Sequence, residues 1–323
     1  MTMNWGVLGA AAFARDHMAP AIHAARGARL AALATSSPDK GAAFQAFAPD
    51  LRIMDSYDAL LADPAIDAVY IPLPNHLHVE WTIKALEAGK HVLCEKPIAL
   101  EAGQFDKLEA AQAASGKLAA EAFMIVHHPQ FTRARDLVQS GAIGKVMHVD
   151  ATFSYNNAGE AENIRNKPDT GGGGLPDIGV YTFGAARFVT GQDCTRVDFA
   201  DIRYENGVDV FAQVAAKLGD ISYAATVSMR MFPRQQITFH GDKGVLTLTC
   251  PFNANLHDMA QLRLETEAGR VSTERWPAAN HYVLQVEAFG DAARNGTPYA
   301  CPLTFSRGTQ EMMDMVFAAG PKP

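Results

Sequence analysis

The first third of the chain alternates short apolar runs with segments of helical spacing, and this pattern constrains the fold more than any other feature. Strands that are separated by helices of about 10–15 residues form parallel sheets through right-handed crossovers. We therefore predict a doubly wound α/β domain over residues 1–122. Its strands are expected at residues 5–8, 28–34, 65–73, 91–94 and 118–124, and its helices at residues 15–25, 39–48, 78–88 and 101–114.

Residues 123–323 show a different pattern, in which apolar and polar residues alternate in runs bounded by Gly, Asp or Pro. Half-buried strands that follow one another directly form largely antiparallel sheets. A length of 323 residues also fits two domains. We expect a second, α+β domain with a large, mostly antiparallel open sheet. Its strands are expected at residues 145–154, 208–218, 222–230, 236–240, 244–249 and 261–267, and its helices at residues 175–190, 282–295 and 310–319.

Composition excludes several classes of protein. The net charge of -7 argues against a nucleic-acid partner, because phosphate neutralisation needs an excess of Lys and Arg on one face. No apolar run approaches the roughly 20 residues that span a bilayer. The four cysteines lie far apart without a Cys-x-x-Cys motif, which argues against a disulfide framework or a zinc cluster. We expect a cytoplasmic protein that binds neither membranes nor nucleic acids, and no metal site.

The loop after the first predicted strand is a candidate dinucleotide site, because ligands of doubly wound sheets bind beyond the carboxyl ends of the strands. Gly9–Ala14 has the pattern G-x-A-x-x-A, a loose form of the G-x-G-x-x-G/A fingerprint. Gly9 allows a tight turn, Ala11 allows the backbone to approach a pyrophosphate, and Ala14 allows close helix packing. Phe13 belongs to the same candidate set. An ordinary strand–turn–helix junction in an Ala-rich chain fits the pattern equally well.

The end of the second predicted strand bears on the choice of cofactor. NAD-binding proteins carry Asp or Glu here, about 20 residues beyond the glycines, for the ribose 2′-hydroxyl. This chain has Ser36 and Ser37 instead, and Lys40 follows in the next helix. Hydroxyls donate to a 2′-phosphate that a carboxylate would repel, so we favour NADP and leave NAD open. Alternatively, the serines only cap the next helix.

Three further segments carry a resemblance to a known family. They are DAVYIPLPNHLH at residues 67–78, GKHVLCEKP at residues 89–97 and GGGGLPDIGVY at residues 171–181. In this order they resemble the Gfo/Idh/MocA family, which includes glucose–fructose oxidoreductase and inositol dehydrogenase. The resemblance implies NAD(P)-dependent hydride transfer between nicotinamide C4 and a carbinol or carbonyl carbon of a sugar, polyol or dihydrodiol. Tyr181 stands where many members carry His, as in the sugar- and dihydrodiol-oxidising branches.

The resemblance also implies the catalytic roles. Lys96 of the Glu-Lys-Pro motif would contact the substrate hydroxyl and the nicotinamide ribose, next to Pro97 in a peptide bond that is often cis in the family. Tyr181 would act as the general base in oxidation or the acid in reduction, and a nearby ammonium stabilises its phenolate. Asp177 shares a helix face with Tyr181 and would orient substrate hydroxyls. A solvated lysine, a buried tyrosine and an aspartate at a helix start are the structural alternatives.

Other contacts implied by the resemblance lie at strand ends and in one loop. Arg165, in the polar loop of residues 156–170, is a candidate donor to substrate or cofactor. Ile125 and Val126 stand where the family commonly has Tyr-Arg, so the particular substrate is left open. The expected cofactor contacts after the third and fourth strands are Leu73, Asn75, His76 and Glu95.

Assembly and two alternative functions complete the expectations. In the family, the open face of the second sheet often forms a dimer interface, which implies a homodimer or homotetramer. A non-catalytic dinucleotide-sensing regulator is one alternative function, although it would not need a proton-transfer residue. A glycosidase of the same family, which uses bound NAD transiently, is the other.

Overall fold

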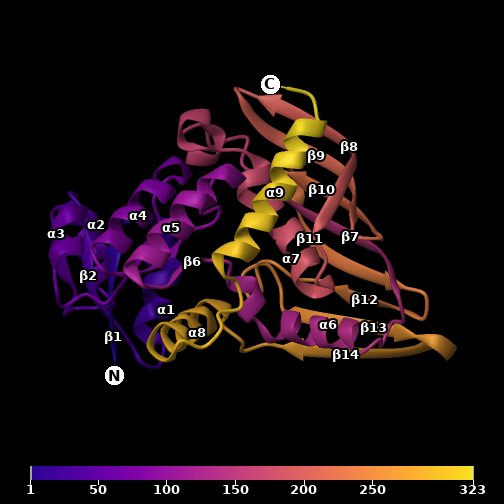
Figure 1. Cartoon of the computed structure of the whole chain (residues 1–323), viewed down its shortest axis with the longest axis horizontal. Coiled ribbons are helices and arrows are strands. Elements are labelled where there is room, and N and C mark those ends of the chain that lie inside the picture. Colours follow the sequence, from indigo (N-terminus) through magenta and orange to yellow (C-terminus); the bar gives the residue numbers. More distant parts are fainter. Residues whose placement is uncertain (1, 323) are drawn as a thin grey trace. The chain divides into compact units, whose positions relative to one another are not determined.

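The computed structural model describes residues 2–322, which form two compact units (Figure 1). The first unit contains the segment up to Ala99, Gly103–Met124 and His281–Phe305. The second contains Leu100–Ala102, Ile125–Asn280 and the segment that starts at Ser306. The division expected at residue 122 lies close to Met124, but it did not include the return of His281–Phe305 to the first unit.

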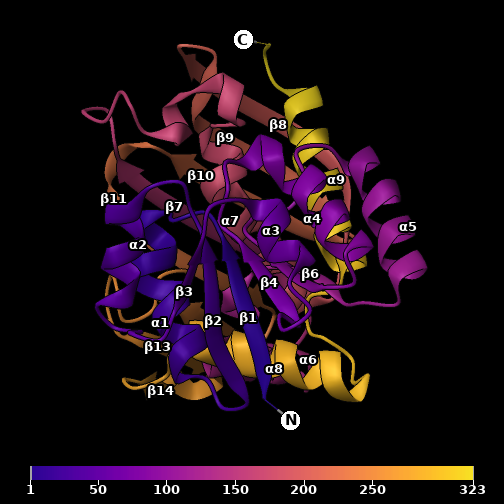
Figure 2. The ribbon, with the colours of Figure 1, turned by 90° about the vertical axis from the view of Figure 1, so that its left-hand side faces the viewer.

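The first unit is built on a six-stranded parallel sheet with the order β3-β2-β1-β4-β5-β6. Figure 2 shows β1, β2 and β3 side by side. In this order the chain reverses direction across the sheet between β1 and β4, at the switch point where ligands of such sheets bind. The doubly wound fold expected from the sequence is confirmed. The strands are β1 (Met3–Leu8), β2 (Ala28–Ala34), β3 (Arg52–Met54), β4 (Ala68–Ile71), β5 (His91–Cys94) and β6 (Ala119–Glu121).

Burial explains why these strands are nearly continuous apolar runs. All residues of β4 are buried, as are the last five of β2, because helices cover the sheet. The buried core continues into helices through residues such as Leu86, Phe105 and Leu108. The helical elements of this unit are η1 (Ala14–Met18, a π-helix), α1 (Ala19–Ala24), α2 (Pro38–Gln45), α3 (Tyr57–Ala62), η2 (Asn75–Leu77), α4 (His78–Glu87), α5 (Phe105–Ser115) and α8 (His281–Asn295).

One strand of this sheet was not expected from the sequence, which indicated five. Strand β3 has only three residues and lies at the sheet edge, where Ile53 is exposed. A run of three residues is too short for its alternation to be recognised as a strand pattern, which needs about four to eight residues. The expected strand at residues 118–124 is likewise reduced to Ala119–Glu121.

The second unit contains an eight-stranded sheet with the order β14-β13-β12-β11-β7-β10-β9-β8. Its pairs are antiparallel except for β10 with β7, so the expected mostly antiparallel sheet is confirmed. The two strands that sequence reasoning missed, β8 and β14, are the two edges, and both carry the charged residues typical of sheet edges. The strands are β7 (Val146–Asn156), β8 (Cys194–Glu205), β9 (Val208–Leu218), β10 (Ile221–Ser228), β11 (Arg230–Gly241), β12 (Gly244–Leu248), β13 (Ala260–Thr266) and β14 (Arg270–Trp276).

A buried helix packs against one face of this second sheet. Helix α7 (Val180–Thr190) is buried from Val180 to Val189 and lies against β7. The predicted helix at residues 175–190 is thus present, with its first turn as the π-helix η7 (Leu175–Gly179). The other helical elements are η3 (Ala102–Gln104), η4 (Met124–His127), α6 (Pro129–Gln139), η5 (Ile164–Asn166), η6 (Pro168–Thr170), η8 (Glu267–Gly269) and α9 (Leu303–Ala319). Within residues 2–322, no helix has the length and apolar character to cross a membrane.

Packing between the two ends of the first unit generates a stability prediction. Trp5 of β1 and Phe289 of α8 are fully buried, with ring centroids 5.2 Å apart. Replacing Phe289 by Ala should reduce the free energy of unfolding by about 3–5 kcal/mol, as for other large core truncations. Urea unfolding followed by tryptophan fluorescence measures the change. The control is Phe232→Ala, at a side chain that is 88% exposed, which should stay within about 0.5 kcal/mol of the parent. Equal effects of both would contradict the prediction.

Candidate active site

The loop after β1 has the backbone geometry that a dinucleotide fingerprint requires. Gly9 has a φ of +101° and donates its N–H to the carbonyl of Ala34 at 3.0 Å. A Cβ at Gly9 would lie 2.9 Å from Cδ2 of Leu73, so no larger residue fits without a shift. The following helix begins at Ala12, and its first N–H groups have no partners within the helix. Ala14 is fully buried beneath this turn. These residues fit a bound pyrophosphate.

The serines after β2 have different local roles. Ser37 is the N-cap of α2, where its side chain accepts the N–H of Lys40 at 3.4 Å. Ser36 and Lys40 are both exposed. The capping role that the sequence left open therefore holds for Ser37, and Ser36 keeps an exposed hydroxyl at the end of β2.

The turn after β5 carries Lys96 and is held by two acidic side chains, the half-buried Glu95 and the buried Glu121. Glu95 accepts the hydroxyl of Tyr70 at 2.6 Å and the N–H of Lys96 at 3.2 Å. Burial, and next the charge of Glu95, raise the pKa of Tyr70 well above its ordinary value, so this phenol stays a donor. Glu121 accepts the N–H of Ile98 at 2.9 Å. The peptide bond between Lys96 and Pro97 is cis, as the resemblance implies.

His78 ties this turn to the end of β4. Its side chain is fully buried, and its ring nitrogens lie 2.7 Å from the carbonyl oxygens of Pro97 and Leu73. Burial lowers the pKa of His78 to about 4, whereas the hydrogen bonds to the carbonyls of Pro97 and Leu73 act to raise it. Asn75 and His76 lie in η2 between these points, with His76 exposed. One histidine thus fixes both loops that carry expected cofactor contacts.

Phe13 contacts an aromatic group that comes from the far end of the sequence. Its ring lies 5.0 Å from that of His17 and 5.7 Å from that of Tyr282 in α8. Burial, and next the charge of Glu95, raise the pKa of Tyr282. Helix α8 therefore supports the residues at the carboxyl ends of β1 and β5, a contribution that no local sequence signal indicated.

In the second unit, the glycine run leads directly into the helix with Asp177 and Tyr181. Gly173 has a φ of +128°, and its N–H donates to the carbonyl of Arg165 at 3.0 Å. Gly172 donates in the same way to the carbonyl of Lys167 at 3.0 Å. The run therefore pairs with the backbone of the polar loop, which is possible because the glycines carry no side chains.

The carboxylate of Asp177 is held by two donors from two other elements. Tyr155 of β7 donates its hydroxyl to Oδ2 at 2.6 Å, and Nε of Arg165 lies 2.9 Å from Oδ1. Asp177 is 10% exposed, whereas the side chain of Arg165 is 38% exposed. The charge of Asp177 raises the pKa of Arg165, and burial, followed by that charge, raises the pKa of Tyr155. At neutral pH the group is a carboxylate between a phenol and a guanidinium.

Tyr181 lies one helical turn beyond Asp177, and its ring packs against aromatic side chains. It is 5% exposed, and its ring centroid lies 5.7 Å from that of Phe153 and 5.9 Å from that of Phe252. Phe153 and Tyr155 are two residues apart on β7 and so share one face of the strand. The guanidinium of Arg165 also interacts electrostatically with Tyr181. Asp177, Tyr181 and Arg165 are therefore brought together, and the functional roles expected of them from the sequence stay predictions.

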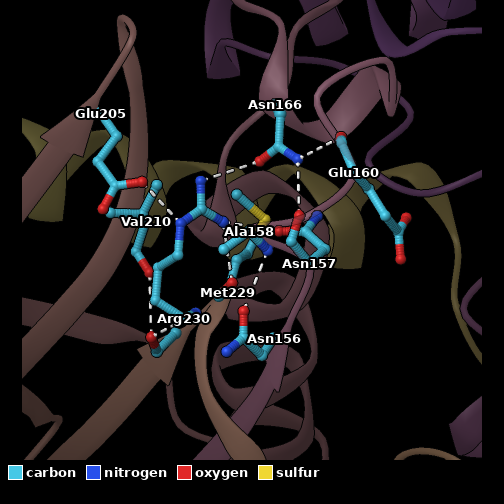
Figure 3. A network of polar contacts seen from close by, with 10 residues as sticks. Asn156, Asn157, Ala158, Glu160, Asn166, Glu205, Val210, Met229 and Arg230 are labelled. Atoms are coloured by element: carbon cyan, nitrogen blue, oxygen red, sulfur yellow. Dashed lines mark hydrogen bonds and ion pairs between the residues drawn. The ribbon is translucent and has the colours of Figure 1, made fainter.

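Arg230 anchors the loop that supplies Arg165 (Figure 3). Its Nη1 donates to Oδ1 of Asn157 at 2.7 Å and to the carbonyl of Met229 at 2.9 Å. Its Nη2 donates to Oδ1 of Asn166 at 3.2 Å, and Nε pairs with Glu205 at 2.7 Å. Asn157 and Asn166 come from the two ends of the loop, so one arginine fixes its shape.

Several supporting residues were missed by sequence reasoning. The members of this set are buried or half-buried polar groups that hold other residues: Tyr70, His78, Glu121, Tyr155 and Arg230. A polar residue within an apolar strand was a usable signal for Tyr70. Among residues 2–322, no three His, Cys, Asp or Glu side chains form a group that could hold a metal ion.

The strand order and the loop after β1 define a dinucleotide-binding protein of the Rossmann type. Residues 3–123 match the model of the Gfo/Idh/MocA oxidoreductase family, with its NAD-binding Rossmann fold, and residues 131–247 match the Gfo/Idh/MocA C-terminal domain. The chain belongs to this family and is an NAD(P)-dependent oxidoreductase.

Individual relatives cover nearly the whole chain. An uncharacterized oxidoreductase of Rhizobium meliloti is 36% identical over 320 residues, which cover 97% of this chain and 96% of the relative. A D-xylose 1-dehydrogenase (NADP(+)) of Haloferax volcanii is 36% identical, with 91% and 90% covered. A dTDP-3,4-didehydro-2,6-dideoxy-α-D-glucose 3-reductase of Streptomyces violaceoruber is also 36% identical, with 90% and 84% covered.

A solved structure shares the fold over the full length of the chain. It is a 3-ketoreductase from Actinomadura kijaniata in complex with NADP and TDP-benzene. The two chains have a TM-score of 0.91 and 29% sequence identity, with 100% of this chain and 99% of the ketoreductase covered.

The geometry of the glycine run generates a second stability prediction. A Cβ at Gly173 would overlap Oδ1 of Asp209, and the φ of +128° is itself unfavourable for other residues. Gly173→Ala should therefore lower the free energy of unfolding by about 2–4 kcal/mol. The matched control is Gly191→Ala, at a φ of +67° with nothing within 4 Å, which should lose about 1 kcal/mol. Urea unfolding of both variants measures the difference, and equal losses would argue against a clash at Gly173.

Proposed function

We propose that this protein transfers a hydride between NADP(H) and a carbinol or carbonyl carbon of a sugar, with a polyol or dihydrodiol as the alternative substrates. The observation that carries the proposal is the arrangement of three side chains. Arg165 of the polar loop pairs with Asp177 and interacts with Tyr181, and both of these lie on the helix that follows the glycine run. Two relatives whose names specify sugar oxidation or sugar ketone reduction support the substrate class. Assembly as a homodimer or homotetramer through the second sheet stays a prediction of the resemblance.

The backbone around Gly9 and the strand-end residues would hold the cofactor. When bound, NADP(H) supplies or accepts the hydride at nicotinamide C4. Gly9, Ala11, Phe13 and Ala14 shape the turn for its pyrophosphate, and Ser36 and Lys40 would bind the 2′-phosphate. The remaining expected contacts are Leu73, Asn75, His76, Glu95 and Lys96.

Proton transfer is assigned to Tyr181 and polarisation of the reacting oxygen to Lys96. In reduction, the phenol of Tyr181 would give its proton to the carbonyl oxygen of the substrate; in oxidation, its phenolate would take the proton from the substrate hydroxyl. The ammonium of Lys96 donates a hydrogen bond to the same oxygen and stabilises negative charge on it. The positive charge of Arg165 favours the phenolate of Tyr181. Asp177 pairs with Arg165 and so holds it in place. We assign to Asp177 the further role of orienting the hydroxyls of the substrate.

Two substitutions test these catalytic roles. Tyr181→Phe and Lys96→Met should each lower kcat by about 100-fold or more with the best sugar of a panel of aldoses, ketosugars, inositols and dihydrodiols. The loss follows because each variant lacks the group that stabilises charge or moves the proton. Absorbance at 340 nm follows NADPH, and Lys107→Met, at an exposed lysine of α5, is the control. Unchanged turnover in both variants would refute the roles.

The same assay separates the alternatives. Cofactor binding without turnover of any sugar would favour the dinucleotide-sensing function. Glycoside cleavage without net change in the cofactor would favour the glycosidase function.

Cofactor preference is tested at the end of β2. Ser36→Asp should raise the KM for NADP by at least about tenfold, because the carboxylate would repel the 2′-phosphate at close range. The KM for NAD, which lacks this phosphate, should change little and serves as the internal control. A parent enzyme that prefers NAD strongly would contradict the assignment of Ser36.

A further inference from the structure

A buried carboxylate lies beneath the glycine run, and the roles proposed above do not use it. Asp209 is on β9 between Val208 and Val210, and only 3% of it is exposed. A carboxylate that is removed from water is unfavourable unless donors satisfy it. The hydrogen-bond donors around Asp209 therefore indicate its role.

The donors come from the start of the helix that carries Asp177 and Tyr181. The N–H of Leu175 donates to Oδ2 of Asp209 at 2.6 Å, and the N–H of Gly174 also binds this carboxylate. N–H groups in the first turn of a helix have no acceptor within the helix. A negative charge at this end is also favoured by the helix dipole. Asp209 therefore caps the start of this helix, although it lies 34 positions from Leu175 in the sequence.

The glycine run is shaped to admit this carboxylate. A Cβ at Gly173 would overlap Oδ1, and a Cβ at Gly174 would lie 3.3 Å from Oδ2. The backbone thus passes over Asp209 more closely than a side chain would permit. The same glycine, Gly173, also binds the carbonyl of Arg165, so the polar loop and the helix start are fixed at one place.

We propose that Asp209 is a positioning residue of the active site: it holds the glycine run and the first helical turn so that Asp177 and Tyr181 are presented to the substrate. The assignment rests on the function proposed above. Asp209 acts through the N–H groups of Gly174 and Leu175 and takes no part in proton transfer.

The charge state of Asp209 gives the proposal a pH signature. Burial raises the pKa of Asp209 to about 7, although the N–H groups of Leu175, Asp209 itself and Gly174 act to lower it. The titratable groups that face it are Asp177 from the helix and Tyr204 from β8. The pKa of Asp209 is higher in the folded site than it would be in an opened, solvated site. The free energy needed to open the site therefore falls as the pH rises from about 4 to 7. Above about 7 the stability levels off.

The first test uses two variants and one matched control. Asp209→Ala removes both acceptor oxygens, Asp209→Asn keeps one, and Asp220→Ala makes the same truncation at an exposed turn residue. Amide hydrogen exchange of residues 171–182, without cofactor or sugar, should be about tenfold faster in Asp209→Asn and faster still in Asp209→Ala. The kcat should fall in the same order with the KM for NADP unchanged, and Asp220→Ala should match the parent. Unchanged exchange in both Asp209 variants would overturn the proposal.

A second arm uses the parent protein and decides the question if Asp209→Ala does not fold. Protection of residues 171–182, corrected for intrinsic exchange, should fall from pH 5 to 7 by up to about tenfold per pH unit and then level off. Asp209→Asn should lack this dependence. Flat protection in the parent together with unchanged exchange in Asp209→Asn would overturn the proposal. If exchange behaves as expected but the parent turns over no sugar, the proposed function fails while the capping role of Asp209 stands.

Discussion

The ion pair between Asp177 and Arg165 is the interaction on which the second unit's site depends. With Tyr155 on the other carboxylate oxygen, it joins the helix, the polar loop and β7 through a single carboxylate. Hydrogen bonds to charged groups are about twice as strong as neutral ones, and a carboxylate that is 10% exposed is little screened by water. Because all three elements meet at Asp177, the position of Tyr181 one turn later is set as well.

In the first unit, polar side chains likewise fix a segment that carries a residue with a proposed catalytic role. The turn that carries Lys96 is held by Glu95 before it, by Glu121 after it and by His78 from α4. These groups bind backbone atoms of the turn and so fix the path of the chain on both sides of Lys96. In both units the residues with proposed catalytic roles are presented by buried polar groups that bind the backbone or one another.

The sequence was sufficient for the architecture of the two sheets and for most of their strands, because strand periodicity is a short-range property. It was insufficient where a contact depends on how strands pair. Tyr155 meets Asp177 across 22 residues, and Arg230 meets Asn166 across 64. Each pair joins a strand to a helical segment that is distant in sequence, and no local pattern contains such a contact. The short or charged edge strands β3, β8 and β14 were missed for a related reason, since they are held by one neighbour only.

The return of His281–Phe305 to the first unit has a consequence for synthesis on the ribosome. Trp5 is translated 284 residues before its partner Phe289. Domains that are complete at the N-terminus fold while the rest of the chain is being made. This unit cannot fill its core until His281–Phe305 has been translated, so its first strands wait for a helix that is made much later. During that interval the apolar side chain of Trp5 in β1 stays without its partner on α8.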